Sequence, residues 1–308
     1  MIRPPLTNRA GLPQAVVDAV VNDSYSKGDA DISVTGLLKP PRVAVLEAKH
    51  ANEIVEDASD RIWSLLGQSI HTILERANRT AIAERRLSIE IEGWRVSGAM
   101  DLYQEDSALL DYKITSVHKI LQGNLDEWNS QLNFYSVILR HHGHKVSKLQ
   151  VIAILRDWSK MEARCNPQYP QAQVVNVDIP VWDPVAAMQR MRDRVILHQQ
   201  ARITLPECSP EDRWARPDVF AVMRVNRKRA VKLYPTKDEA LAYAGADKNL
   251  YVIQRPGMSV RCQEYCGPSK FCTQYQSSLS STERPAEEGD EITLANTIGE
   301  SNVIYATA

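Results

Sequence analysis

The sequence predicts an α/β protein whose mixed sheet is flanked by helices, followed by a smaller C-terminal α+β module that carries clustered cysteines. Two observations predict this fold class. Helical periods alternate with short runs of period two over residues 60–204, and three of the five cysteines fall within residues 262–272. Of the 308 residues, 44% are hydrophobic and 24% are charged. This composition is that of a globular protein, and it excludes collagen-like, wholly disordered and disulfide-scaffold classes.

Residues 1–59 are predicted to form an N-terminal segment ahead of the core. Pro13 can open a short helix over residues 14–21, and Pro40-Pro41 marks a break. No apolar stretch in this segment has the length of a signal-peptide core or of a membrane helix. We therefore expect a cytoplasmic protein with no membrane partner.

Residues 60–204 are predicted to form the core. A helix is expected from Asp60 to about Glu84, because apolar side chains recur at helical spacing from Ile62 to Ala77. Short alternating runs then predict strands that form an antiparallel meander. The elements expected after the first helix are strands over 87–91, 94–103 and 108–115, a helix over 126–141, a strand over 148–155 and a helix over 184–202.

Two further regions complete the chain. Residues 205–276 are predicted to form a second module, with a hairpin over 220–234, a helix capped by Thr236 and a strand near Tyr251. Residues 277–308 are polar, lack periodicity and hold six acidic residues against one basic residue. Such a composition predicts a disordered acidic tail.

The strongest chemical pattern is Asp101 followed by Asp111-Tyr112-Lys113. If residues 105–107 form a three-residue hairpin loop, the register places Asp101 opposite Asp111, with Cβ atoms about 5 Å apart. Opposed carboxylates are unfavourable on a sheet unless they share a partner such as a divalent cation. Lys113, on the same face, could then orient an attacking water or stabilise charge on a phosphate. The alternative is a solvated face of an antiparallel sheet.

Two pairs of side chains at helical spacing flank this pattern. Gly67 and His71 lie at positions i and i+4 of the first predicted helix. The glycine would let another backbone approach, and the histidine could reach the sheet. Gln131 and Tyr135 repeat the spacing on the second long helix. Taken alone, each pair is also compatible with an ordinary helix face.

In chain order these motifs resemble the series of the RecB-like branch of the PD-(D/E)XK nucleases, over about residues 60–157. The series consists of G-x-x-x-H from Gly67 to His71, G-x-x-D from Gly98 to Asp101, D-x-K from Asp111 to Lys113, and Q-x-x-x-Y from Gln131 to Tyr135. The resemblance implies a restriction-endonuclease-like nuclease core over residues 60–204.

The resemblance also implies a role for each matched position. The implied ligands of Mg²⁺ or Mn²⁺ are His71, Asp101, Asp111 and the backbone carbonyl of Tyr112. Lys113 would be the catalytic lysine. Gln131 and Tyr135 would support the catalytic site and contact DNA.

The second chemical pattern is Cys262-x3-Cys266-x5-Cys272. Cys208, in a proline-containing loop, is the best candidate for a fourth ligand, and Cys165 is the expected bystander. On ligand count, four thiolates suit a 4Fe-4S cluster or a structural Zn²⁺ equally well, and unligated thiols are a third interpretation.

This arrangement resembles nucleases closed by an iron-sulfur cluster, such as the AddB-type helicase-nucleases and the CRISPR adaptation nucleases. Those proteins carry one cysteine before the nuclease motifs and a C-x2-C-x5-C trio after them. This chain departs from them twice, because its first spacer has three residues and Cys208 follows the core. The resemblance implies a 4Fe-4S cluster, with Zn²⁺ as the alternative.

A third pattern is a basic stretch with no acidic residue between Val222 and Lys232. On a hairpin tip it could contact DNA phosphates, or it could be a solvated turn. Trp214 and Tyr234 flank it and could stack on bases or belong to the core. The candidate DNA-binding residues are Arg224, Arg227, Lys228, Arg229 and Lys232.

Together these patterns predict metal-dependent hydrolysis of DNA phosphodiester bonds. The family resemblance favours an exonuclease that acts at DNA ends in recombination, repair or end processing. The sequence has no P-loop motif, so a helicase, annealing or recombination partner would be a separate chain. The alternatives are a DNA-end-binding or assembly subunit without turnover and a zinc-stabilised nucleic-acid adaptor.

Overall fold

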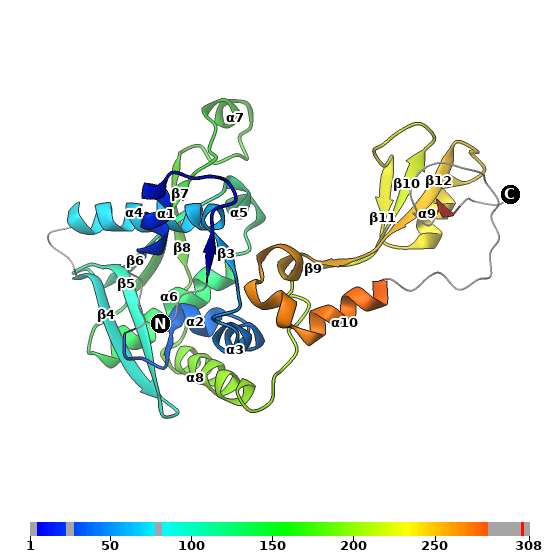
Figure 1. Cartoon of the computed structure of the whole chain (residues 1–308). Helices are drawn as coiled ribbons and strands as arrows, with labels where there is room; N and C mark the ends of the chain where they lie inside the picture. The colour runs from blue at the N-terminus through cyan, green and yellow to red at the C-terminus, as the bar shows by residue number, and fades with distance from the viewer. Residues whose placement is uncertain (1–4, 23–27, 78–81, 283–302, 305–308) are drawn as a thin grey trace. The chain divides into compact units, whose positions relative to one another are not determined.

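The computed structural model describes residues 5–22, 28–77, 82–282 and 303–304 (Figure 1). The chain divides into two compact units, Met1–Pro206 and Glu207–Ala308. Within the described ranges, no helix combines the length and the apolar character needed to cross a bilayer.

The first unit is built on a six-stranded mixed sheet with the strand order β2-β5-β6-β7-β8, and β4 pairs with β5. The strands are β2 (Ile32–Ser33), β4 (Ile82–Ile91), β5 (Trp94–Tyr103), β6 (Ala108–Thr115), β7 (Lys148–Leu155) and β8 (Val174–Ile179). β4, β5 and β6 are consecutive antiparallel strands, which confirms the predicted meander. β7 runs parallel to β6 and antiparallel to β8.

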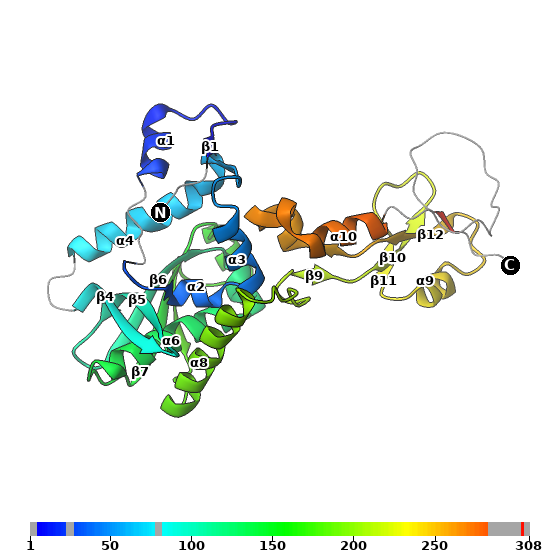
Figure 2. The ribbon, with the colours of Figure 1, turned by 60° about the horizontal axis from the view of Figure 1, so that its bottom comes forward.

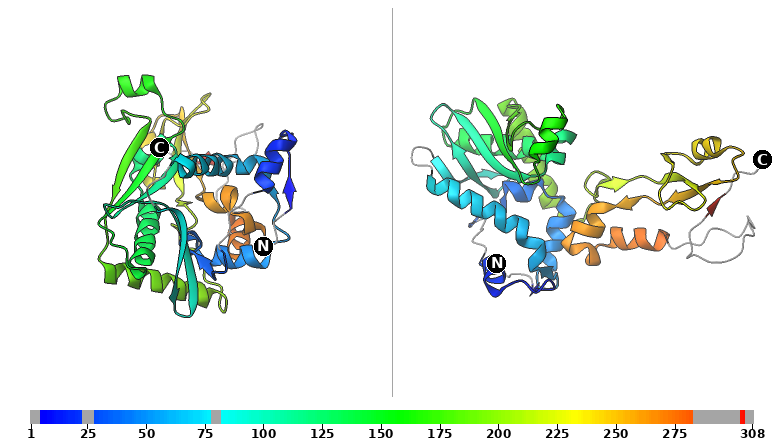
Figure 3. Two further views of the ribbon diagram at one scale, coloured as in Figure 1. Left: turned by 90° about the vertical axis from the view of Figure 1, so that its left-hand side faces the viewer. Right: turned by 90° about the horizontal axis from the view of Figure 1, so that it is seen from above.

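Helices cover both faces of this sheet, so the predicted fold class is confirmed. The described helices that follow Arg61 in this unit are α4 (Ile62–Ala77), α5 (Val117–Gln122), α6 (Asp126–His141), α7 (Lys160–Cys165) and α8 (Pro184–Ala201), and α7 lies beyond the end of the sheet (Figure 1). α6 provides the crossover that the parallel strands β6 and β7 require, and it packs across the sheet. α8 packs on α6 (Figure 1, Figure 3). α4 packs on β6, across the sheet from α6 (Figure 2).

The core of this unit lies between α6 and the sheet. Leu132 and Ile138 of α6 and Leu149 and Val151 of β7 have no exposed surface. Each of these side chains contributes about 1.5–3 kcal/mol through removal of apolar surface from water. The strands and α6 that carry most of the site described below are therefore held by this core.

The first long helix is shorter than the sequence pattern predicts. α4 ends at Ala77 and β4 begins at Ile82, whereas the helix was expected to reach Glu84. β4 pairs with β5 over its whole length, from the pair of Ile82 and Tyr103 to Ile91. These cross-strand hydrogen bonds come from the next strand of the hairpin, so helical periodicity within residues 60–84 could not predict this boundary.

Residues 1–59 are part of the first unit and do not form a separate segment. α1 (Gln14–Val21) follows Pro13 as predicted, and α2 (Val34–Leu38) and α3 (Pro41–Lys49) lie on either side of the predicted break. However, β2 pairs with β5, and Val34 and Leu37 are fully buried in the main core cluster. The remaining short elements are β1 (Leu6–Thr7), β3 (Glu56–Asp57) and the 3₁₀ turn η1 (Ala58–Arg61).

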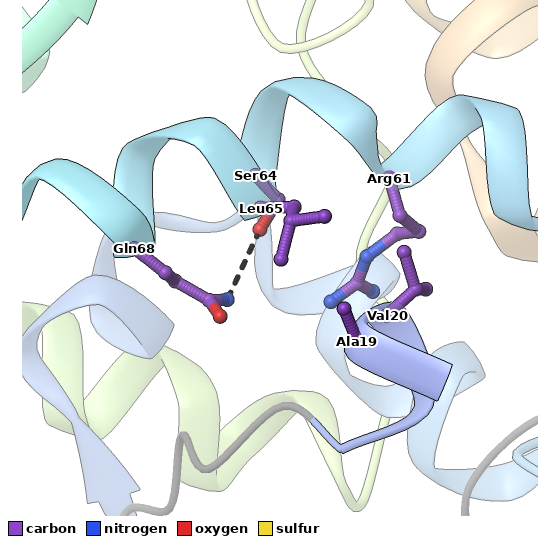
Figure 4. Close-up of a pocket in the computed structure, with 6 residues that line it drawn as sticks. All are labelled: Ala19, Val20, Arg61, Ser64, Leu65 and Gln68. Carbon is purple, nitrogen blue, oxygen red and sulfur yellow. Dashed lines mark hydrogen bonds between the residues drawn. The ribbon is translucent and has the colours of Figure 1, made fainter. Parts of the chain in front are cut away.

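α1 packs beside the start of α4 around a small hollow (Figure 4). The hollow is lined by Ala19, Val20, Arg61, Ser64, Leu65 and Gln68. Gln68 Nε2 lies 3.4 Å from Ser64 Oγ along the helix. A cavity of about 10 Å³ has room for one water molecule at most, so this hollow is a packing feature.

The second unit contains a four-stranded sheet with the order β11-β10-β12-β14. Its elements are β10 (Val219–Arg224), β11 (Lys232–Tyr234), α9 (Lys237–Ala244), β12 (Leu250–Arg255) and β14 (Val303–Ile304) (Figure 1). The predicted hairpin and the strand near Tyr251 are confirmed. The cap is confirmed as well, because Thr236 Oγ1 accepts a hydrogen bond from Glu239 N.

The cysteine-bearing segments lie before β10 and between β12 and β14 in the sequence. They contain the paired strands β9 (Ala215–Arg216) and β13 (Met258–Ser259), the π-helical turn η2 (Arg261–Tyr265), the 3₁₀ turn η3 (Gly267–Phe271) and α10 (Thr273–Thr282). The disordered tail predicted over 277–308 needs correction at two places. α10 continues to Thr282, and β14 pairs with β12. The rest of the predicted tail lies outside the described residues.

Candidate active site

β5 and β6 separate beside the predicted carboxylate pair, and this gap carries the candidate site. The last paired residues of the two strands are Leu102 and Leu110. In the same register the next pair would be Asp101 and Asp111, but the strands are no longer paired there. On the same edge of β5, β2 pairs only as far as Ser97. The predicted register is confirmed, but the strands part where the direct pair was expected.

The Asp101 carboxylate bridges this gap. Its Oδ2 accepts a hydrogen bond from Tyr112 N at 2.8 Å, and its Oδ1 lies 3.3 Å from His71 Nδ1. The hydrogen bond to Asp101 raises the pKa of His71, although burial of the imidazole opposes the shift. His71 thus reaches the sheet from α4, as the sequence predicts.

Asp111 is the buried member of the pair, with 2% of its surface exposed. Gln131 Nε2 donates to Asp111 Oδ1 at 3.2 Å. Lys113 Nζ lies 2.8 Å from Asp111 Oδ2 and pairs with this oxygen. Burial raises the pKa of Asp111 to about 6, and repulsion by Asp101 acts in the same direction.

Lys113 remains a cation in this environment. Burial disfavours the charged amine, but attraction to Asp111 outweighs that effect and raises the pKa of Lys113. A protonated lysine can stabilise negative charge on a phosphate, and it cannot accept a proton.

α6 supports the site through Gln131 and Tyr135. Gln131 Nε2 also donates to Tyr135 Oη at 3.1 Å, and the Tyr135 ring packs directly on Gly98 of β5. A Cβ atom at Gly98 would lie 2.8 Å from Tyr135 Cδ1. The close approach expected at Gly67 is wrong, because no described atom lies within 4 Å of a Cβ atom placed there.

The donor chemistry of this site fits a divalent cation. Two carboxylates and an imidazole converge from β5, β6 and α4, and carboxylate and imidazole donors suit Mg²⁺ or Mn²⁺. In their present positions, no three His, Cys, Asp or Glu side chains of the described residues are grouped closely enough to hold a metal ion. The charges of Lys113 and His71 lie against the two carboxylates instead. The ligand roles therefore stay predictions.

The second unit brings Cys208 to the C-terminal cysteine trio. Gln274, two residues after Cys272, joins the Cys208 loop to α10: Cys208 N donates to Gln274 Oε1, and Gln274 Nε2 donates to Cys208 O, each at 2.9 Å. Burial raises the pKa of Cys266 to about 12, and Cys262, Cys272 and Cys208 all contribute to the shift in the same direction. No sequence pattern points to Gln274, whose position just after Cys272 is the only signal.

By their chemistry the thiol donors suit a soft or borderline metal, but in their present positions no three of the described cysteines are grouped closely enough to hold one. Buried thiols with raised pKa stay protonated until a metal ion displaces their protons, and four sulfur donors suit Zn²⁺ or a 4Fe-4S cluster. Cys165 belongs to the first unit, where it is exposed at the end of α7. The ligand role of the four cysteines and the identity of the metal therefore both stay predictions.

The basic hairpin exposes four of its five predicted cationic residues, Lys232 among them, and Arg224 is half-buried. Residues 227–229 are exposed in the turn between β10 and β11. Arg224 lies 3.8 Å from the carboxylate of Asp247, and Lys232 Nζ lies 5.0 Å from the centroid of the Tyr234 ring. Residues 227–229 are therefore the strongest candidates for phosphate contacts.

Comparisons with known proteins give limited information about the class of protein. No family model matches the chain, and no curated protein matches its sequence. Among solved structures, the chain is similar to SSO0001 with 19% identity and a TM-score of 0.43, over 61% of this chain and 87% of that one. It is also similar to a phage-related exonuclease from Haemophilus somnus 129PT, with 13% identity and a TM-score of 0.38, over 56% of this chain and 94% of that one. At these values, the site itself has to carry any functional conclusion.

Proposed function

We propose that this chain is a metal-dependent nuclease that hydrolyses phosphodiester bonds in DNA. The observation that carries the proposal is the convergence of Asp101, Asp111, Lys113 and His71 at the gap between β5 and β6. Two carboxylates at one site would repel a phosphate backbone unless a cation lies between them.

The chain's own residues would prepare this site for reaction. His71, Asp101, Asp111 and the backbone carbonyl of Tyr112 would hold Mg²⁺ or Mn²⁺. When bound, such a cation lowers the pKa of its water and offsets charge on the leaving oxygen. Contacts with Tyr112 N and His71 fix the orientation of the Asp101 carboxylate.

Gln131 and Lys113 would complete the arrangement. The hydrogen bond from Gln131 Nε2 fixes the rotamer of the Asp111 carboxylate, and the bond from Gln131 to Tyr135 fixes the amide in turn. Lys113, protonated beside Asp111, would attract a non-bridging oxygen of the scissile phosphate and orient the attacking water.

We further propose that cleavage starts at DNA ends, as the motif resemblance implies, and that it serves recombination, repair or end processing. A helicase, annealing or recombination partner would supply any unwinding. Because imidazole favours softer ions than oxygen ligands do, Mn²⁺ should support cleavage at least as well as Mg²⁺.

In the second unit, we propose that Cys208, Cys262, Cys266 and Cys272 hold a 4Fe-4S cluster, with Zn²⁺ as the alternative. Two hydrogen bonds between the Cys208 backbone and the Gln274 side chain support this ligand set. They hold the Cys208 loop against a residue that lies only two positions after Cys272. The exposed residues 227–229 would contact DNA phosphates.

A cleavage assay tests the proposed activity. The protein is incubated with linear and circular DNA, single- and double-stranded, in Mg²⁺, Mn²⁺ or EDTA, and labels at the 5′ or 3′ end report the direction of degradation. We expect loss of linear DNA with either metal, none with EDTA, and resistance of covalently closed circles. Cleavage of circles would overturn end-directed action and retain the nuclease, whereas binding without metal-dependent cleavage would favour an end-binding or assembly subunit.

A further inference from the structure

Two exposed aromatic rings lie side by side in the cysteine-bearing part of the second unit. Trp214 is 49% exposed and Tyr265 is 69% exposed, and their ring centroids are 5.3 Å apart with an interplanar angle of 57°. The guanidinium carbon of Arg261 lies 5.4 Å from the centroid of the Trp214 ring. We call Trp214, Tyr265 and Arg261 the aromatic platform.

The backbone beneath this platform is unusual at both rings. Trp214 has φ of 50°, in the left-handed region where a bulky side chain is strained. Tyr265 closes the π-helical turn η2, a rare form that is frequent at functional sites. Trp214 N donates to Glu211 O at 3.0 Å, which helps to hold the strained loop. Burial of apolar surface would turn two large rings inward, so their exposure here needs another reason.

Backbone contacts tie the two ring-bearing segments together next to the cysteines. Arg261 N donates to Arg213 O at 3.1 Å, and the Arg261 guanidinium donates to Asp212 O at 3.3 Å. Cys262 lies within η2, and Cys266 follows it directly. The platform therefore has a fixed geometry and a cationic edge.

We propose that the aromatic platform stacks on unpaired bases of single-stranded DNA. Every base has a π face, so stacking on tryptophan and tyrosine tolerates any sequence, and an arginine adds a cation–π contact. Bases within a duplex are already stacked and paired, so they cannot occupy the exposed ring faces. This inference rests on the proposed action on DNA, and it adds that the DNA bound by the protein contains a single-stranded region.

A binding assay with the full chain in EDTA measures this stacking without cleavage. Fluorescence anisotropy compares labelled oligo(dT) with an oligonucleotide of the same length whose sugars carry no bases. The wild-type protein should bind oligo(dT) about 100-fold more tightly than the abasic strand, about tenfold for each ring. Trp214→Ala and Tyr265→Ala should each lower oligo(dT) affinity by about tenfold, and should leave both abasic affinity and the salt dependence unchanged. The matched control, Tyr265→Phe, keeps the ring and should keep the base preference.

A second variant separates binding from packing. Trp214→Gly relieves the positive φ, so the second unit should unfold at the same or a higher temperature while the preference for oligo(dT) falls by about tenfold. If the ring only packs against the protein, the unfolding temperature should fall and the base preference should remain, which would overturn the inference. An equal loss of affinity for the abasic strand would overturn it as well.

The outcome is independent of the nuclease assay. A protein that cleaves DNA but shows no preference for bases over abasic sugar-phosphate contradicts the platform alone. A protein that shows the preference but cleaves nothing contradicts the nuclease and keeps the platform as a DNA-binding surface.

Discussion

Gly98 illustrates how the absence of a side chain positions the candidate site. In Gly98→Ala the new Cβ atom would meet Tyr135 Cδ1 at 2.8 Å, and Tyr135 is only 5% exposed, so its ring has no open space to enter. We expect the free energy of unfolding to fall by about 1–3 kcal/mol. Displacement of Tyr135 should also disturb Gln131 and hence Asp111, so cleavage should slow. Urea denaturation and cleavage rates measure the two effects.

Gly67→Ala is the matched control for this prediction. No described atom lies within 4 Å of its Cβ position, and alanine is favoured over glycine in a helix by about 1 kcal/mol. This variant should therefore unfold at the same or a higher urea concentration. If Gly98→Ala proves as stable as Gly67→Ala, the close packing of α6 on β5 is not what requires glycine at position 98.

His198 predicts a pH dependence of stability in the first unit. Burial and the positive charge of Arg194 lower the pKa of His198 to about 4, so the folded protein keeps this imidazole neutral. The unfolded chain binds the proton near pH 6.5. The contribution of His198 is therefore complete above pH 6.5 and is lost as the pH falls toward 4, at a cost on the order of 2 kcal/mol.

Unfolding monitored by tryptophan fluorescence at pH 7.5 and pH 4.5 measures this effect, because five of the six tryptophans precede residue 207. In His198→Gln the amide can still donate to Leu37 O, which His198 Nε2 approaches at 3.2 Å, but it does not titrate. The loss of stability between the two pH values should be smaller in this variant than in the wild-type protein. An unchanged loss, equal to that of the exposed His118→Gln control, would contradict the role of His198.

Local sequence patterns predict much of the site, because its residues lie on regular elements. Alternation along β6 and the three-residue loop predict the register of Asp101 and Asp111, and helical spacing predicts the pairing of Gln131 with Tyr135. The gap between β5 and β6 could not be predicted. It depends on where β2 and β6 each stop pairing with β5, and no local pattern encodes a contact between distant strands.

The hairpin of β10 and β11 makes a prediction about DNA binding that is separate from the chemistry. Replacing Arg227, Lys228 and Arg229 by Ala should weaken binding alike for every DNA sequence, because these exposed side chains would contact only phosphates. The slope of log affinity against log salt concentration should shrink by about two to three units. Cleavage at saturating DNA should survive, since the carboxylates lie in the first unit. An unchanged slope would make this hairpin a solvated turn.

The ends of helices and strands were predicted best where local residues, such as a proline or a capping side chain, determine them. Pro13 and the Asp183-Pro184 pair define the starts of α1 and α8, where Asp183 Oδ1 accepts hydrogen bonds from the first backbone amides of α8. α4 and β4 were divided wrongly because the partner strand β5 decides that boundary. β2 has only two residues, too few for any periodicity, so its place in the sheet could not be predicted.

The division of the molecule into two units separates the carboxylate site from the thiols. All four proposed thiol ligands lie in the second unit, and Cys165 lies in the first. Metal removal should therefore destabilise the second unit selectively, because metal-binding free energy contributes to the folding of a small segment. Limited proteolysis of protein treated with a chelator should cut after residue 206 before it cuts the core.

Single cysteine variants test which thiols hold the metal. Cys208→Ser, Cys262→Ser, Cys266→Ser and Cys272→Ser should each lower the metal content of protein purified without oxygen. Cys165→Ser is the control and should retain it. About four irons per chain with absorbance near 400 nm would support the cluster, and stoichiometric zinc in colourless protein would support the alternative. Retention of metal in Cys208→Ser with loss in Cys165→Ser would show that the wrong fourth ligand had been chosen.

The proposal that Asp101, Asp111 and Lys113 form a hydrolytic site is tested most directly by two variants compared in one experiment. Mn²⁺ binding by calorimetry and cleavage of linear DNA are measured on the wild-type protein, Asp101→Asn and Lys113→Ala. Asp101→Asn should lose both metal binding and cleavage, because it removes a ligand charge. Lys113→Ala should keep Mn²⁺ and DNA binding and lose cleavage by about 100-fold or more. Full cleavage by Lys113→Ala, or unchanged Mn²⁺ binding by Asp101→Asn, would contradict the account.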